Sequence, residues 1–280
     1  HYLQMGSGPH VVLLHGAGGN LREFTLGHLD ALAQRYTVTA FDRPGLGYSD
    51  RVPGVATGAL AVEGDPPMDQ AAVLRAAATQ IGIENPIVVG HSFGGIVAMA
   101  WANAGLDEDS PVNASAVVSW AGVLMPWPGE LGRYYTFLGS PLGGAVIPIL
   151  SAYASNERIV SGIPDIFAPD PMPDTYVAQI GAPLTVRTAN FRANVRQVNT
   201  LRPHVVEMSA RYPELTLPIE VIHGTADTTV PIHVHPQELI KIVASANLTT
   251  LDGVGHMPHH ADPEAAVAAI DRAAQRASLP

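Results

Sequence analysis

The chain has 280 residues, of which 47% are hydrophobic and 14% charged. This composition is typical of a globular protein with one large core, with or without an inserted subdomain. Asp and Glu number 25 against 15 Lys and Arg, a formal net charge of −10, so we expect neither a nucleic acid nor an anionic lipid surface as a partner. The absence of cysteine excludes disulfides, thiolate–metal sites and a cysteine nucleophile.

No apolar run reaches the roughly 18 residues that a membrane-spanning helix needs, and no signal peptide is recognisable. The chain begins with His1 and not with Met, so we expect that an upstream segment has been trimmed. A cytoplasmic location is predicted, with export left open. The sequence does not indicate an oligomeric state.

In chain order, short apolar runs alternate with segments of helical spacing. Runs rich in β-branched residues predict strands at 11–14, 36–41, 86–89, 116–120, 219–223 and 248–251. Helical spacing predicts helices at 21–35, 68–81, 93–104, 237–246 and 263–277. Residues 1–5 supply at most part of an earlier strand. Between 126 and about 218 the alternation is lost, and proline and aromatic residues become frequent.

Strands alternating with helices of about a dozen residues predict a mostly parallel sheet covered on both faces. The fold class is therefore α/β, with a doubly wound sheet and an inserted helical cap. We place the core at residues 1–125 and 217–280 and the cap at 126–216.

The strongest chemical motif is GHSFGG, which follows a predicted strand directly and opens a predicted helix. A serine on such a sharp turn stands clear of the backbone, and flanking glycines relieve the crowding. The N–H groups at the start of the following helix favour negative charge at the same point. The motif predicts Ser92 as a nucleophile, with a structural Gly/Ser turn as the alternative.

A serine hydroxyl needs a base to take its proton, and the base needs an acid to orient it. Asp227 follows the strand predicted at 219–223, and His256 lies on a glycine-rich loop after the last predicted strand. In a parallel sheet these positions converge at the carboxyl ends of the strands. We predict His256 as the general base and Asp227 as its acid; Asp252 is the main rival to Asp227.

The segment HGAGG follows the first long predicted strand, where a glycine-rich loop can present backbone N–H groups to an oxyanion. We predict that the N–H groups of Ala17 and Phe93 form this oxyanion hole. A dinucleotide-binding loop is excluded, because Leu21 and Asp50 stand where the pattern G-x-G-x-x-G needs glycine. No cofactor is expected.

Several other residues are of types that often act in catalysis or metal binding. His91 adjoins the nucleophile, but we do not expect it to be the base, because adjacent side chains on a tight turn point apart. For His233, His235, His259 and His260 no carboxylate or further histidine lies at a convincing ligand spacing. We predict ordinary surface histidines and no metal site. The segment from Asp42 to Ser49 is interpreted as a turn beneath the active-site floor.

Taken together, HGAGG, DRPGLGYSD, GHSFGG, GTADTTVP and GVGHMPH resemble the α/β-hydrolase superfamily, in its branch of capped esterases, C–C hydrolases and cofactor-free haloperoxidases. The resemblance spans nearly the whole chain except the cap. Haloalkane dehalogenases and epoxide hydrolases of this superfamily carry Asp where this chain has Ser92, which argues against both activities here.

The leading hypothesis is hydrolysis of a carboxylic ester of a small-to-medium hydrophobic substrate through an acyl-enzyme. The same three side chains could also cleave a carbon–carbon bond in a diketone or ring-cleavage product. A ligand-binding protein without turnover is a third hypothesis. The cap aromatics Trp127, Tyr134, Tyr135, Phe137, Phe167 and Phe191 are expected to form its packing core. Arg187, Arg192, Arg196 and Arg202 keep a carboxylated substrate open.

Overall fold

A computed structural model describes residues 1–129, 131–153 and 161–279 of the chain. Its sheet has the strand order β1-β3-β2-β4-β5-β6-β7. The strands are β1 (Tyr2–Met5), β2 (His10–Leu14), β3 (Thr37–Phe41), β4 (Ile87–His91), β5 (Ala116–Trp120), β6 (Ile219–Gly224) and β7 (Ala246–Leu251). Only the edge strand β1 runs antiparallel to its neighbour, β3; the other described pairs are parallel.

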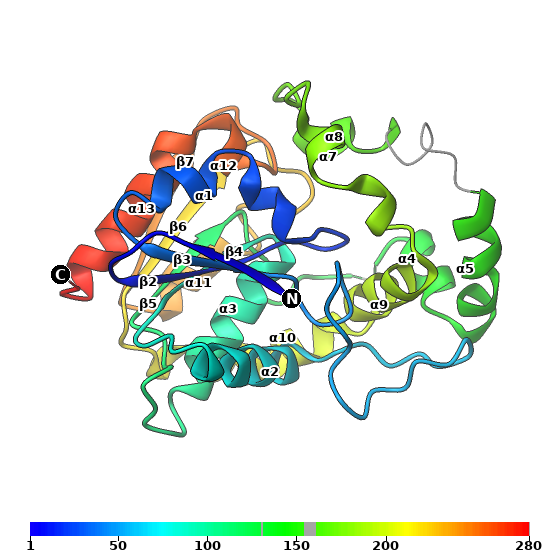
Figure 1. The fold of residues 1–280 in the computed structure, drawn as a ribbon, viewed down its shortest axis with the longest axis horizontal. Coiled ribbons are helices and arrows are strands. Elements are labelled where there is room, and N and C mark those ends of the chain that lie inside the picture. Colours follow the sequence, from blue (N-terminus) through cyan, green and yellow to red (C-terminus); the bar gives the residue numbers. More distant parts are fainter. Residues whose placement is uncertain (130, 154–160, 280) are drawn as a thin grey trace.

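The central strands are buried on both faces. Successive side chains point to opposite sides of the sheet, and helices cover each side. In β2, Val12 and Leu14 pack in one hydrophobic cluster, and Val11 and Leu13 pack in the other. The first cluster contains buried residues of α2 (Pro67–Gln80), α3 (Phe93–Ala104), α10 (Leu201–Ser209) and α11 (Pro236–Ile242). The second contains residues of η1 (Leu21–Thr25), α1 (His28–Leu32) and α13 (Pro263–Arg276). The predicted α/β fold is confirmed, as the helices on both faces show (Figure 1).

Two predicted helices are wrong in their extent. The helix expected at 21–35 is two short pieces, η1 and α1, because Gly27 between them adopts a φ of 97°, a left-handed conformation that interrupts a helix. The helix expected at 237–246 ends at Ile242, and Ala246 already belongs to β7. The helix at the serine motif begins and ends as predicted, at Phe93 and Ala104.

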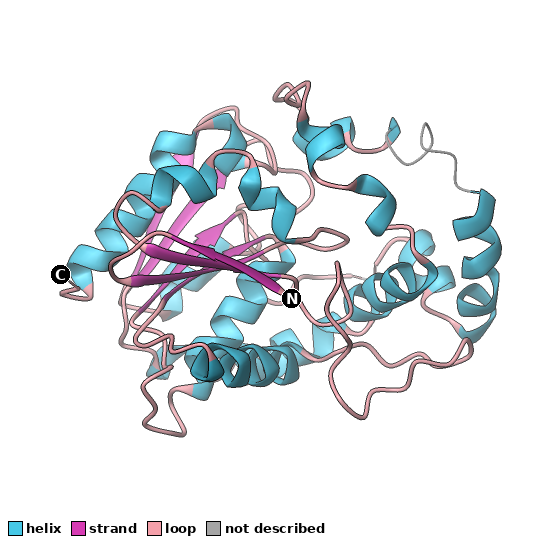
Figure 2. Cartoon of the chain, in the orientation of Figure 1, coloured by secondary structure: helices cyan, strands magenta, loops and turns pink. Residues whose placement is uncertain are grey.

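Between β5 and β6 the described chain is helical, and Figure 2 shows no strand there. The elements are α4 (Arg133–Leu138), α5 (Pro141–Tyr153), α7 (Pro164–Phe167), α8 (Tyr176–Gln179), η2 (Ala182–Leu184), α9 (Thr188–Asn199), α10 and η3 (Tyr212–Glu214). Leu138, Ile147 and Val195 form a small core of their own. Leu201 and Val205 of α10 instead join the large core beside α3. The boundaries of a separate cap at 126 and 216 stay a prediction.

A short helix and a long one complete the chain near its carboxyl end. The helix α12 (Pro258–Ala261) follows the loop after β7 and leads directly into α13. None of the described helices combines the length and the apolar composition that crossing a bilayer requires.

Candidate active site

Ser92 lies between β4 and α3 in a strained conformation. Its φ is 51° and its ψ −117°, which a residue with a side chain adopts only where its surroundings enforce it. A Cβ on Gly94 would lie 2.0 Å from the carbonyl oxygen of Leu14, and one on Gly90 would lie 2.2 Å from that of Gly94. These positions must be glycine because backbone fills the space. The sharp strand–turn–helix geometry predicted for the motif is present.

The structure brings together the three side chains singled out in the sequence. Nε2 of His256 lies 2.9 Å from Oγ of Ser92, and Nδ1 of His256 lies 2.8 Å from Oδ2 of Asp227. All three residues are buried. Because a carboxylate only accepts hydrogen bonds, Nδ1 carries the proton and Nε2 of the neutral ring is free to accept one from the serine. This arrangement is suited to proton abstraction from Ser92.

Asp227 is held by four donors. The backbone N–H groups of Thr229 and Val230 donate to Oδ1 at 2.9 Å each. Nε2 of His223 lies 3.2 Å from Oδ2, the oxygen that also faces His256. Burial alone would raise the pKa of Asp227, but the hydrogen bonds from His223 and His256 outweigh it and hold that pKa well below its usual value. The carboxylate is therefore charged where it can stabilise a protonated His256.

His223 lies near the carboxyl end of β6, and sequence reasoning missed it. Its side chain is fully buried, and its one Nε2–H is shared between the carbonyl oxygen of Val230, at 2.7 Å, and Oδ2 of Asp227, at 3.2 Å. The position four residues before an acid in a turn is the only signal in the sequence, and it is too weak to use alone.

Asp252, the rival of Asp227, and His91, the neighbour of Ser92, both have other contacts. Asp252 is exposed and accepts a hydrogen bond from Oγ1 of Thr225 at 3.1 Å. His91 donates from Nε2 to the carbonyl oxygen of His256 at 3.1 Å, and burial lowers its pKa to about 3. A neutral His91 thus holds the loop that carries His256.

The glycine loop after β2 lies directly beside the serine. A Cβ on Gly16 would be 3.1 Å from Cβ of Ser92. Within the part of the chain that the structure describes, neither the N–H of Ala17 nor that of Phe93 donates a hydrogen bond. Both groups are available to an oxyanion, as the sequence predicted, and this role stays a proposal.

Arg43 braces this loop from below. Its Nε donates to the carbonyl oxygen of His15 at 2.8 Å, and its Nη2 donates to that of Gly16 at 3.0 Å. The guanidinium lies 4.3 Å from the ring centroid of Phe93 and is fully buried. Residues 42–47 are thus buried beside the loop, whereas Tyr48 is exposed. Arg43 fixes the carbonyl groups of the loop and thereby its N–H groups.

A cavity of about 460 Å³ opens above Ser92. Its lining is mainly apolar and includes Val123, Trp127, Leu131, Tyr135, Val198, Leu201, Val230 and Val234, with Thr228, Thr229 and His235 among the polar members. Of the predicted cap aromatics, Trp127 and Tyr135 line this cavity, and Phe167 is buried. Tyr134 and Phe137, 58% and 47% exposed, do not form a packing core.

The arginines that kept a carboxylated substrate open are not among the described residues that line this cavity. Arg192 and Arg196 line a separate cavity of about 580 Å³. Nε of Arg202 donates to the carbonyl oxygen of Trp127, and Arg187 lies over the ring of Tyr48. No clamp for an anion forms at Ser92 among these four side chains.

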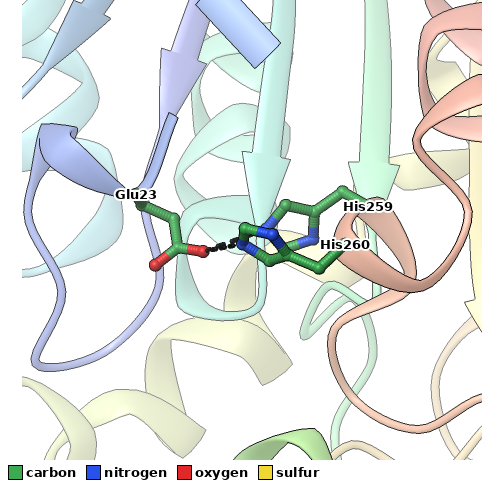
Figure 3. A group of neighbouring side chains, drawn as sticks. All are labelled: Glu23, His259 and His260. Atoms are coloured by element: carbon green, nitrogen blue, oxygen red, sulfur yellow. Dashed lines mark hydrogen bonds and ion pairs between the residues drawn. The ribbon is translucent and has the colours of Figure 1, made fainter. Parts of the chain in front are cut away.

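The prediction of ordinary surface histidines is wrong for three of the four. His235 and His259 are buried, and His260 is partly buried; His233 alone is exposed. Glu23 lies beside the pair at 259 and 260 (Figure 3). Glu23 precedes His259 by 236 residues. Sequence spacing could not reveal this carboxylate, because η1 and α12 meet only in the folded chain.

Comparison with known proteins identifies the family and supports the fold. A protein of Mycobacterium tuberculosis described as uncharacterized is 28% identical over 275 residues, which cover 95% of this chain and 75% of that protein. An enol-lactonase from Burkholderia xenovorans has a TM-score of 0.72 at 17% identity, covering 98% of this chain and 96% of its own. An esterase from Exiguobacterium antarcticum has a TM-score of 0.73 at 17% identity, covering 97% and 94%. The model of the alpha/beta hydrolase family matches residues 11–270, and the chain therefore belongs to that family.

Proposed function

We propose that this protein hydrolyses carboxylic esters of small-to-medium hydrophobic substrates through an acyl-enzyme on Ser92. One observation carries the proposal: the hydrogen-bonded chain from Ser92 through His256 to Asp227 opens on an apolar cavity. Membership of the alpha/beta hydrolase family supports a hydrolytic reaction.

In the proposed mechanism, Nε2 of His256 takes the Ser92 proton while Oγ bonds to the ester carbonyl carbon. The N–H groups of Ala17 and Phe93 stabilise the negative oxygen. When the carbonyl re-forms, the bond to the alcohol oxygen breaks, and His256 gives that oxygen its proton. His256 then takes a proton from water, whose oxygen bonds to the acyl carbon. The bond from that carbon to Oγ breaks, His256 returns the proton to Oγ of Ser92, and the carboxylic acid leaves.

The cavity favours an uncharged substrate. Its described lining contains no Arg or Lys, whereas a carboxylate held in such a cavity would need a cationic or other strong donor. A volume of about 460 Å³ lies within the range of sites for small organic ligands. Two structural neighbours described as an esterase and an enol-lactonase are in keeping with an acyl-oxygen bond as the target.

The test is a panel of p-nitrophenyl esters of increasing acyl length, measured with the wild type and with Ser92→Ala. We expect turnover of the wild type and a loss of about 10⁶-fold in the variant, comparable to the loss of a triad nucleophile in a protease. A fluorophosphonate probe should label Ser92 alone. Turnover that persists in the variant would refute the mechanism.

The two other hypotheses are separated by adding a vinylogous diketo acid to the panel of substrates. Cleavage of a vinylogous diketo acid without ester turnover would indicate a carbon–carbon hydrolase instead. If the fluorophosphonate probe does not label Ser92 of the wild type and no ester is turned over, the protein is a binding protein.

A further inference from the structure

Glu23, His259 and His260 form a buried cluster outside the proposed triad (Figure 3). Oε1 of Glu23 lies 3.2 Å from Nε2 of His259 and 2.6 Å from Nε2 of His260. One ligand atom from each residue lies within 4.8 Å of the other two. Nothing in the proposed ester hydrolysis uses these three side chains.

We propose that this cluster binds a divalent transition-metal ion of the Zn²⁺ type. The ion would take Nε2 of both histidines and a carboxylate oxygen of Glu23 as ligands. Two imidazoles and one carboxylate are a donor set that zinc commonly uses, with a water completing the tetrahedron.

The spacing of the donor atoms suits such an ion. Bonds of about 2.0–2.2 Å at tetrahedral angles place neighbouring donor atoms about 3.4 Å apart. The separation of Oε1 of Glu23 and Nε2 of His259, 3.2 Å, is close to this value. The 2.6 Å between Glu23 and Nε2 of His260 would have to open by about 0.8 Å, which requires a rotation of the partly buried His260 side chain.

The charge of the cluster also favours a cation. The carboxylate of Glu23 is buried, and its ion-pair partners among the described residues are the two histidines, with no Lys or Arg. A buried carboxylate without a permanent positive partner is costly. A bound divalent cation would offset that charge directly.

The surroundings resemble those that orient metal ligands. The hydroxyl of Tyr176 donates to Oε2 of Glu23 at 2.5 Å, and ligating carboxylates are characteristically held by such a second hydrogen bond. The ring of His259 stacks on Trp120 at 5.1 Å and 13°. This stacking fixes the plane of the imidazole ring.

A cavity of about 270 Å³ reaches one side of the cluster. Glu23 and Tyr176 line this cavity together with Gly16–Asn20 and Met257. We expect a water to reach the fourth position on the ion from the Glu23 side. The ion would connect three segments, η1 through Glu23, α12 through the histidines and, through the Tyr176 hydrogen bond, α8. It would thus fasten the loops that carry Ala17 and His256 to the helical segment above them.

Binding is tested by titrating the metal-free protein with ZnCl₂ in a calorimeter and by following its melting temperature. All proteins carry His1→Ser, because the exposed imidazole of His1 could bind zinc independently. We expect one ion per chain and a rise in Tm of about 5 °C when free zinc exceeds the Kd a hundredfold. Neither readout depends on esterase activity, so a failure of the proposed function leaves this result interpretable.

The variants are Glu23→Gln and His260→Asn, with exposed His233→Asn as the matched control. Asn at 260 can still donate to Glu23, so this variant should fold even if the first does not. We expect both cluster variants to lose the zinc-dependent rise in Tm and at least tenfold in affinity, and the control to keep both. The proposal is overturned if the parent chain binds no zinc, or if His260→Asn binds it as tightly as the control.

Discussion

Replacing Asp227 by Asn tests the proposed acid at the level of single hydrogen bonds. The two carboxylate oxygens receive two donors each, backbone N–H groups at Oδ1 and histidine Nε2 and Nδ1 at Oδ2. An amide has only one oxygen, so its NH₂ group must face one of these pairs of donors in either orientation.

Each orientation has a cost that the structure defines. With NH₂ at the Oδ1 position, the turn at Thr229 and Val230 loses both of its side-chain bonds. With NH₂ at the Oδ2 position, His256 must move its proton to Nε2 and then cannot accept one from Ser92. The second orientation is preferred, because an imidazole can change its tautomer, whereas the backbone N–H groups of Thr229 and Val230 can only donate. We therefore expect kcat to fall about 10⁴-fold, or about 5.5 kcal/mol, which is the loss that the equivalent change causes in a serine protease.

The assay is kcat/KM for p-nitrophenyl butyrate, with circular dichroism to show that the variant is folded. Asp252→Asn is the matched control, because this exposed side chain contacts Thr225 and not His256; its activity should stay within about twofold. A folded Asp227→Asn that keeps more than a tenth of the activity would refute the reasoning. A larger loss in Asp252→Asn would transfer the role to the rival.

Three further changes have defined outcomes. Gly94→Ala should abolish ester turnover and lower Tm, because the added Cβ would lie 2.0 Å from the carbonyl oxygen of Leu14; a fully active variant would contradict the geometry of the turn. Burial lowers the pKa of His15 and of His91 to about 3, so between pH 6.5 and 3 the unfolded chain binds protons that the folded chain does not. The free energy of unfolding should therefore fall with falling pH by about 1.4 kcal/mol per unit for each such histidine, and urea unfolding of His91→Asn between pH 6.5 and 4.5 should show a slope shallower by about that amount; an unchanged slope would mean that His91 is not buried neutral. Val198→Trp narrows the cavity above Ser92 and should shift the preferred p-nitrophenyl ester to shorter acyl chains, which the ratio of kcat/KM for octanoate and acetate measures; an unchanged ratio would place the acyl chain elsewhere.

The sheet was predictable because its central strands are buried on both faces. Apolar runs such as 116–120 and the glycine-bounded strand before Ser92 carry this signal locally. The chain order of Ser92, Asp227 and His256 was readable for the same reason, since each follows a strand end. The division of 21–35 into η1 and α1 could not be predicted in this way. The pattern of apolar residues continues across Gly27, but the left-handed backbone of Gly27 interrupts the helix.

The sequence by itself determined the α/β fold and the serine, aspartate and histidine that lie together at the ends of β4, β6 and β7. These features are local: each depends on residues adjacent in the chain, and the parallel sheet then aligns the strand ends. Only the tertiary structure decided which side chains surround them. Glu23 meets His259 and His260, His223 shares Asp227 with His256, and the cap arginines lie away from the cavity above Ser92. The contacts of Glu23 join segments far apart in the sequence, and the contact of His223 depends on the conformation of the turn that follows it. Neither can be predicted from periodicity or spacing.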